Sequence, residues 1–151
     1  LDFFEGKGKP KSIQEKIELT DESLSVPIIG YLDLKYESTI RDIKTSGKRP
    51  NFAKMPDNVS RQMSVYWKAT GLMPVADYII VRMSDVLTET YPVYDINEHW
   101  AVTLRAAQTM QRVLSISTDI QEIASFFMPD FSTWDWDARE IEEAKKLWGI
   151  K

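Results

Sequence analysis

The sequence predicts a protein of mixed class, α/β or α+β. Candidate strands fill most of its first half and helical patterns fill its second half. Hydrophobic residues make up 43% and charged residues 28% of the chain, as in ordinary globular proteins. A length of 151 residues allows a real hydrophobic core, so we expect a single domain over residues 1–151.

The strand candidates begin near the N-terminus. Ile13–Leu19 shows partial apolar alternation, Ile28–Tyr36 is rich in Ile, Leu and Tyr, and Thr39–Thr45 is rich in β-branched residues. These compositions favour strands. If Glu37-Ser38 forms the loop between the last two, they make a hairpin in which Tyr36 faces Thr39.

The later elements follow from periodicity and from helix end signals. For Asp57–Gly71 we expect a helix that Asp57, Asn58 or Ser60 caps and Gly71 ends, with an apolar side formed by Met63, Tyr66 and Trp67. The further predicted elements are strands at Ala76–Met83 and Tyr91–Ile96, and helices at Asn97–Ser117, Thr118–Phe127 and Asp135–Trp148.

Two carboxylates face each other in the predicted hairpin. In this register Asp33 lies opposite Asp42, and Lys44 projects from the same face as Asp42. Opposed like charges destabilise a strand pair, and a cation between them removes that cost. Carboxylate ligands suit Mg²⁺ or Mn²⁺, and a nearby lysine suits an anionic substrate. The alternative is structural: Asp33 pairs with Lys35 or Lys44, and Asp42–Lys44 is a surface ion pair contributing under about 1 kcal/mol.

Three short motifs occur in order along this part of the chain: Gly30-x-x-Asp33, Asp42-x-Lys44 and Gln62-x-x-x-Tyr66. Together they resemble the PD-(D/E)XK nuclease superfamily, and more closely its RecB-like exonuclease branch of phage and CRISPR-associated nucleases. The resemblance covers about Glu15 to Val81. It implies an α/β fold with a mixed central β-sheet flanked by helices, the restriction-endonuclease-like core.

The resemblance also implies a metal-dependent DNA nuclease. Asp33, Asp42 and the backbone carbonyl of Ile43 would bind Mg²⁺ or Mn²⁺, and Lys44 would stabilise the phosphate charge or orient the attacking water. We expect an exonuclease that hydrolyses phosphodiester bonds in recombination, repair or phage DNA processing. The alternatives are a catalytically silent nucleic-acid-binding module on the same fold and a small defence-type endonuclease.

The third motif lies on a predicted helix. Gln62 and Tyr66 are four residues apart, so they share one helix face. In the resembled family, the glutamine positions the catalytic lysine and DNA, and the tyrosine supports the same region. The alternative for Tyr66 is a place in the hydrophobic core.

One metal ligand of the resembled family has no counterpart here. Those nucleases usually carry a histidine on a helix before the first strand, whereas no histidine precedes Gly30. Glu15 or Glu18 could substitute, and a residue upstream of Leu1 is the other possibility. We expect the chain to lack an upstream N-terminal helix and to belong to a larger nuclease. His99, the single histidine, is expected to be structural.

Basic residues gather despite a net charge of −4. The eleven residues from Lys44 to Lys54 contain four cations and no acid. Such a stripe beside an acidic metal site can engage phosphates, although a solvated lysine-rich loop is the alternative. The residues expected to bind nucleic acid are Lys48, Arg49, Lys54, Arg61 and Lys68.

Several classes of protein are excluded or disfavoured by composition. The chain has no cysteine, which removes disulfides and cysteine-bound zinc or iron–sulfur clusters. No apolar run spans a bilayer and no signal peptide is visible, so we expect a cytoplasmic protein without a membrane partner. DNA is the expected partner, and a second copy of the chain or a recombination protein is a further candidate.

Overall fold

The computed structural model describes residues 6–51, 55–83, 85–133 and 136–150. Its elements are β1 (Ser12–Leu19), β2 (Ile28–Lys35), β3 (Thr39–Ser46), α1 (Asp57–Thr70), β4 (Met73–Val81), β5 (Val86–Pro92), α2 (Ile96–Leu114), α3 (Ile120–Ala124) and α4 (Ala138–Trp148). The chain forms two compact units, Leu1–Ala106 and Ala107–Lys151. All five strands of the sheet belong to the first unit. That residues 1–151 form one domain stays a prediction.

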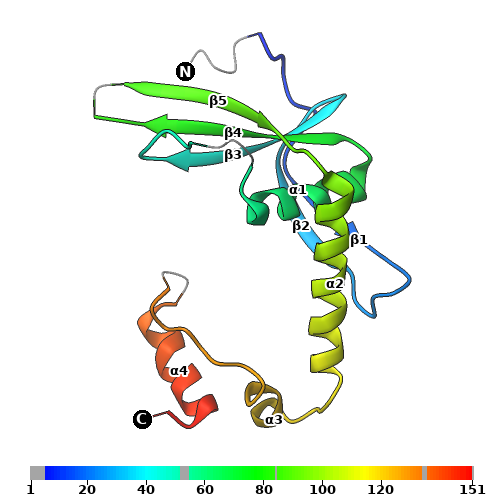
Figure 1. Cartoon of the computed structure of the whole chain (residues 1–151), viewed down its shortest axis with the longest axis vertical. Coiled ribbons are helices and arrows are strands. Elements are labelled where there is room, and N and C mark those ends of the chain that lie inside the picture. The colour runs from blue at the N-terminus through cyan, green and yellow to red at the C-terminus, as the bar shows by residue number, and fades with distance from the viewer. Residues whose placement is uncertain (1–5, 52–54, 84, 134–135, 151) are drawn as a thin grey trace. The chain divides into compact units, whose positions relative to one another are not determined.

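The first unit is built on a five-stranded sheet in the order β1-β2-β3-β4-β5 (Figure 1). β3 and β4 are parallel, and α1 lies between them in sequence as their crossover connection. The other neighbours in the sheet are antiparallel. The predicted α/β class, with a mixed central sheet and flanking helices, is confirmed.

The hairpin of β2 and β3 has the predicted register at its closed end. Leu34 pairs with Arg41 and Lys35 with Ile40. Beyond these two pairs the strands separate before Asp33 reaches Asp42. The backbone N–H of Ile43 donates instead to the side chain of Asp33, at 2.8 Å. Asp33 and Asp42 therefore do not pair directly as predicted. The two strands are apart at this point, and the Asp33 carboxylate bridges them by accepting the Ile43 N–H.

β1 carries an irregularity beside this opening. Gln14 has φ +53°, in the left-handed region, between the regular pairs of Ile13 with Leu34 and Glu15 with Leu32. In Figure 1, β1 and β2 run at a steep angle to β3, β4 and β5. Asp33 lies on β2 opposite the irregular position, so the bend and the opening in the sheet occur at the same level.

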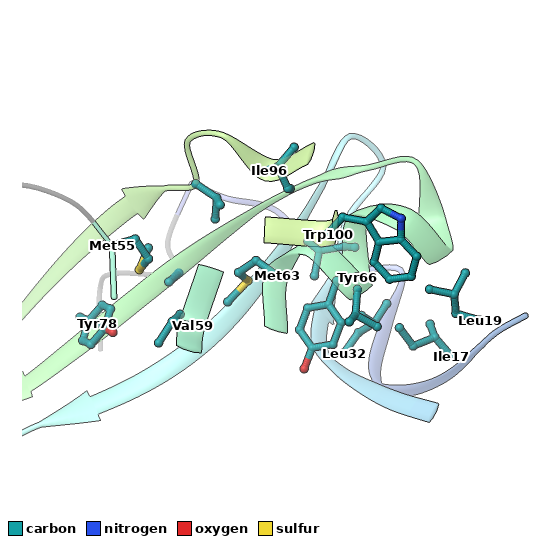
Figure 2. Packing of buried hydrophobic residues seen from close by; sticks show 14 of the residues in the cluster. Ile17, Leu19, Leu32, Met55, Val59, Met63, Tyr66, Tyr78, Ile96 and Trp100 are labelled. Atoms are coloured by element: carbon teal, nitrogen blue, oxygen red, sulfur yellow. The ribbon is translucent and has the colours of Figure 1, made fainter. Parts of the chain in front are cut away.

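The core lies between the sheet and α1. Figure 2 shows side chains of β1, β2 and α1 gathered there with Trp100 of α2. Met63 and Tyr66 are buried and Trp67 is partly buried, as the helical spacing predicted. The buried cluster is Ile17, Leu19, Leu32, Ile40, Met55, Val59, Met63, Val65, Tyr66, Ala76, Tyr78, Ile80, Val93, Ile96 and Trp100.

Two details of the first unit differ from the prediction. The last strand is Val86–Pro92 rather than Tyr91–Ile96, because its residues pair along β4 and the chain turns into α2 at Ile96. Helix α1 starts after Pro56 with no side-chain cap, so the proposed caps at Asp57, Asn58 and Ser60 were wrong.

The predicted end of α1 at Gly71 is confirmed, whereas α2 and α3 end three residues before the predicted positions and α4 begins three residues after its predicted start. Gly71 closes α1 in the left-handed conformation, at φ +73°. In the second unit, Asp137 and Glu140 form a capping box at the start of α4. Trp148 of α4 donates its indole N–H to the Phe127 carbonyl at 2.9 Å. Within the described parts of both units, no helix has the length and apolarity that crossing a bilayer requires.

Candidate active site

An ion pair on β3 lies at the centre of the candidate site. Ile40, Asp42 and Lys44 alternate toward the face of β3 that α1 covers, because successive side chains of a strand point to opposite faces. Asp42 is only 2% exposed. The Lys44 ammonium lies 2.7 Å from its Oδ2 atom. A charged pair is thus held at the interface between sheet and helix.

Gln62 of α1 connects this pair to the helix. Its Oε1 atom accepts a hydrogen bond from Lys44 at 2.8 Å. Its Nε2 atom donates to the Tyr66 hydroxyl at 2.7 Å and lies 3.3 Å from Asp42 Oδ1. Tyr66 in turn donates to the Tyr31 carbonyl of β2 at 2.9 Å. The four side chains form one network that ties α1 to two strands.

Gly30 gives this network the space it needs. A Cβ atom at this position would lie 3.3 Å from Ile17 and 3.3 Å from the Tyr66 ring. Such approaches are tighter than ordinary van der Waals contacts, so a larger residue would press on Tyr66. The glycine of the Gly30-x-x-Asp33 motif therefore has a packing explanation in this fold.

Asp33 of β2 is held by hydrogen bonds from both neighbouring strands, β1 and β3. Its Oδ2 atom accepts the Ile43 N–H, and its Oδ1 atom accepts a hydrogen bond from Gln14 Nε2 at 2.8 Å. Sequence reasoning missed Gln14, because a neutral amide in a strand pattern carries no catalytic signal.

Burial changes the acidity of two site residues. The pKa of Asp42 is raised, and burial is the largest cause of the rise. The Lys44 ammonium opposes the rise, and the Asp33 and Asp77 carboxylates add to it. Burial likewise raises the pKa of Tyr66 to about 12, so its phenol stays protonated at neutral pH and keeps donating. The network is thus a set of fixed donors around one poorly solvated carboxylate.

The predicted metal ligands are only partly brought together. Asp33 and Asp42 lie near enough for each charge to affect the other, as the pKa of Asp42 shows. Glu15 instead pairs with Lys35 at 2.6 Å, and the exposed Glu18 lies 3.7 Å from Lys16. Across the described residues, no group of three or more His, Cys, Asp or Glu could hold a metal ion.

The two aspartates fit a magnesium ion by donor chemistry. Both provide the hard oxygen atoms that Mg²⁺ prefers, and water commonly completes its coordination. Burial penalises the ionised form of Asp42, and a bound cation would relieve that penalty. Ile43 contacts Asp33 through its backbone N–H. Its carbonyl stays a predicted ligand only.

The predicted nucleic-acid-binding residues have varied surroundings. Arg49 pairs with Glu89 of β5, and Arg61 lies 3.7 Å from Asp57. The Lys68 ammonium sits 5.8 Å from the centre of the Trp100 ring. Lys48 is exposed in the loop after β3. Lys54 falls outside the described residues. His99 is buried on α2, in agreement with a structural role.

A cavity of about 400 Å³ borders the network on the β2 side. Gln62 and Tyr66 form part of its wall, together with Tyr31 and Val65. Tyr31 is 55% exposed. The open space next to the buried pair lets a solvent-borne ligand approach the edge of the site.

Comparison with known proteins finds structures that share the fold but does not identify a family. No family model matches the chain, and no curated protein matches it by sequence. Among solved structures, a protein of Eubacterium rectale described as a "putative exonuclease" superposes with a TM-score of 0.51 at 13% identity, over 87% of this chain and 51% of that one. The protein SSO0001 gives a TM-score of 0.44 at 15% identity, over 81% and 59%. The chain thus spans little more than half the length of either, and it shares its fold with the first of them.

Proposed function

We propose that this protein is a metal-dependent nuclease of the PD-(D/E)XK type, in its RecB-like branch, and acts on DNA as an exonuclease. One observation carries the proposal. Two motifs that lie apart in the sequence meet in one connected network of Asp42, Lys44, Gln62 and Tyr66, and Asp33 of the remaining motif lies near enough for its charge to affect Asp42. The nuclease-like fold is consistent with this chemistry.

Lys44 is the residue that would meet the phosphate. Two acceptors fix its ammonium, Asp42 Oδ2 at 2.7 Å and Gln62 Oε1 at 2.8 Å. A cation held in this way stabilises the charge that develops on a phosphoryl group without first having to reorganise. Gln62 is held by Tyr66, so both helix residues act by positioning the lysine.

Asp33 and Asp42 would bind Mg²⁺ or Mn²⁺. The bound ion would polarise the phosphoryl oxygen and lower the pKa of a water molecule, as metal ions do in hydrolytic enzymes. The basic residues that the sequence predicted would contact the DNA backbone away from this centre. Exposed Lys48 is the simplest of them to test, because Arg49 and Arg61 already have acidic partners.

The experiment is a cleavage assay on linear and circular DNA, single- and double-stranded, with Mg²⁺, Mn²⁺ or a chelator. We expect cleavage of linear DNA in either metal and none with the chelator. Lys44→Ala should lower the rate by about a hundred- to a thousandfold, as loss of an oxyanion-stabilising donor does. Its Mn²⁺ affinity, measured by calorimetry, should stay near that of the wild type.

The matched control is Lys16→Ala, which removes an exposed lysine of β1 that lies 3.7 Å from Glu18. It should cleave like the wild type. If Lys44→Ala cleaves within about threefold of the wild type, Lys44 has no part in catalysis. Cleavage of circular DNA at the same rate as linear DNA would show that the activity is that of an endonuclease, because circular DNA has no ends.

A second candidate is a silent nucleic-acid-binding module on the same fold. The absence of a third metal-binding side chain near Asp33 and Asp42, among the described residues, favours it. This candidate predicts DNA binding that neither Mg²⁺ nor Mn²⁺ converts into cleavage. The same assay, read by gel shift as well as by product, therefore separates the two functions.

A further inference from the structure

Gln14 has a backbone conformation that its position in a strand does not explain. Its φ of +53° lies in the left-handed region, which non-glycine residues rarely adopt, and the residues on both sides of it pair regularly with β2. Such strained residues persist where the surrounding structure holds them, and they cluster at functional sites. Such a residue is expected to make a contact that holds it in this conformation.

The contact is the hydrogen bond from the Gln14 amide to Asp33. At 2.8 Å it occupies Oδ1, and the Ile43 N–H occupies Oδ2 at the same distance. The two donors come from β1 and β3, on either side of β2. The carboxylate is therefore fixed in orientation by both of its neighbouring strands.

We propose that Gln14 is a positioning residue that holds the Asp33 carboxylate in the orientation needed to bind the cation. This inference rests on the proposed metal-dependent function. With few protein ligands, the affinity of the site depends strongly on how well each is oriented. The acids first expected to help are engaged elsewhere, since Glu15 pairs with Lys35 and Glu18 lies near Lys16. Partners that orient a metal ligand typically matter 10–100-fold in affinity.

The competing explanation is that the Gln14 amide only joins β1 to β2. The two explanations differ in what happens when Gln14 is replaced by glycine. Glycine adopts φ +53° without strain, so Gln14→Gly removes the amide while keeping the backbone conformation. A joining role predicts lower stability. A positioning role predicts weaker metal binding, with the stability of the metal-free protein kept or raised.

The test measures Mn²⁺ affinity by calorimetry and the melting temperature with a chelator present. For Gln14→Gly we expect Mn²⁺ affinity to fall at least about tenfold. Gln14→Asn is a second variant that tolerates the left-handed conformation but is one methylene too short to reach Asp33, and it should behave in the same way. The matched control is Asp95→Gly, which relieves the same φ of +53° at the start of α2 and should leave Mn²⁺ affinity unchanged.

The outcomes separate the two levels of the proposal. Wild-type Mn²⁺ binding with unchanged affinity in both Gln14 variants overturns the positioning role and leaves the proposed nuclease intact. Loss of melting temperature in parallel with affinity in both variants overturns it in favour of the joining role. No Mn²⁺ binding by the wild type overturns the metal-dependent function and the inference with it.

Discussion

Two buried aspartates on neighbouring strands have opposite surroundings. Asp42 on β3 is 2% exposed and Asp77 on β4 is fully buried. Because Asp42 pairs with Ala76 and Ile43 pairs with Asp77, the two carboxylates point to opposite faces of the sheet. Two aspartates that are both buried, and one position apart in the β3–β4 register, thus lie in different surroundings.

Asp77 is well satisfied by its partners. Arg41 donates to it through Nε at 2.7 Å and Nη2 at 3.2 Å, and the Thr90 hydroxyl donates at 2.6 Å. Asp42 has one lysine and a longer contact of 3.3 Å to Gln62, and burial raises its pKa. The forked arginine pairing fits a structural role, whereas an incompletely satisfied carboxylate fits a ligand-binding one.

The largest expected effect is on the Asp77 side. Asp77→Asn should destabilise the fold by about 3–5 kcal/mol, because it leaves the Arg41 guanidinium in a buried site without its counter-charge. Urea denaturation measures this loss. At low temperature, where the variant is folded, its Mn²⁺ affinity should match the wild type.

The control replaces both members of the pair. Arg41→Met with Asp77→Leu removes the buried charges together, and it should recover most of the lost stability. If Asp77→Asn is as stable as the wild type, the pair with Arg41 is not what stabilises this face of the sheet.

A smaller effect is expected where the Asp42 side depends on close packing. Gly30→Ala puts a methyl group 3.3 Å from the Tyr66 ring, which must shift and weaken its support of Gln62. We expect a loss of about 1–3 kcal/mol in unfolding free energy, typical of overpacking, together with slower DNA cleavage. Gly47→Ala is the matched control, since nothing lies within 4 Å of the added atom. Equal behaviour of the two variants would contradict the packing role of Gly30.

The smallest effect concerns pH and the metal-free protein. The folded pKa of Asp42 is raised, so its contribution to stability is present below about pH 4, where an unfolded aspartate is protonated, and is lost as pH rises through the folded pKa. Asp42→Asn has no such loss. Its stability relative to the wild type should therefore be higher at pH 7.5 than at pH 4, in urea titrations with a chelator. A constant difference between the two pH values would show that burial of this charge costs nothing.

Much of the fold was predictable from local patterns. The β-branched and aromatic content around Tyr36 and Thr39 marked the hairpin, and Gly71 marked the end of α1. The strand after β4 was misplaced, because the Pro92-Val93-Tyr94 stretch looks strand-like by itself and only pairing with β4 decides the boundary.

The residues of the site that belong to short charged motifs could be predicted from the sequence. The contacts between residues far apart in the sequence could not. The grouping of Asp42, Lys44 and Gln62 agrees with the motif order. The opening between β2 and β3 beside Asp33 was not predicted. Nothing in the composition of the two strands indicates that the Asp33 side chain, rather than a backbone carbonyl, accepts the Ile43 N–H. The Arg41 and Asp77 pair was missed for a similar reason, since the two are 36 residues apart.

The opening between β2 and β3 makes one backbone proton a natural reporter. The Ile43 amide donates to a carboxylate rather than to a peptide carbonyl. A hydrogen bond to a charged acceptor is shorter and stronger than one between neutral groups, and it deshields the proton involved. The Ile43 resonance in a nitrogen–proton correlation spectrum should lie downfield of its neighbours in β3. Because that proton senses the charge on Asp33, its frequency should move when a metal ion binds to that carboxylate.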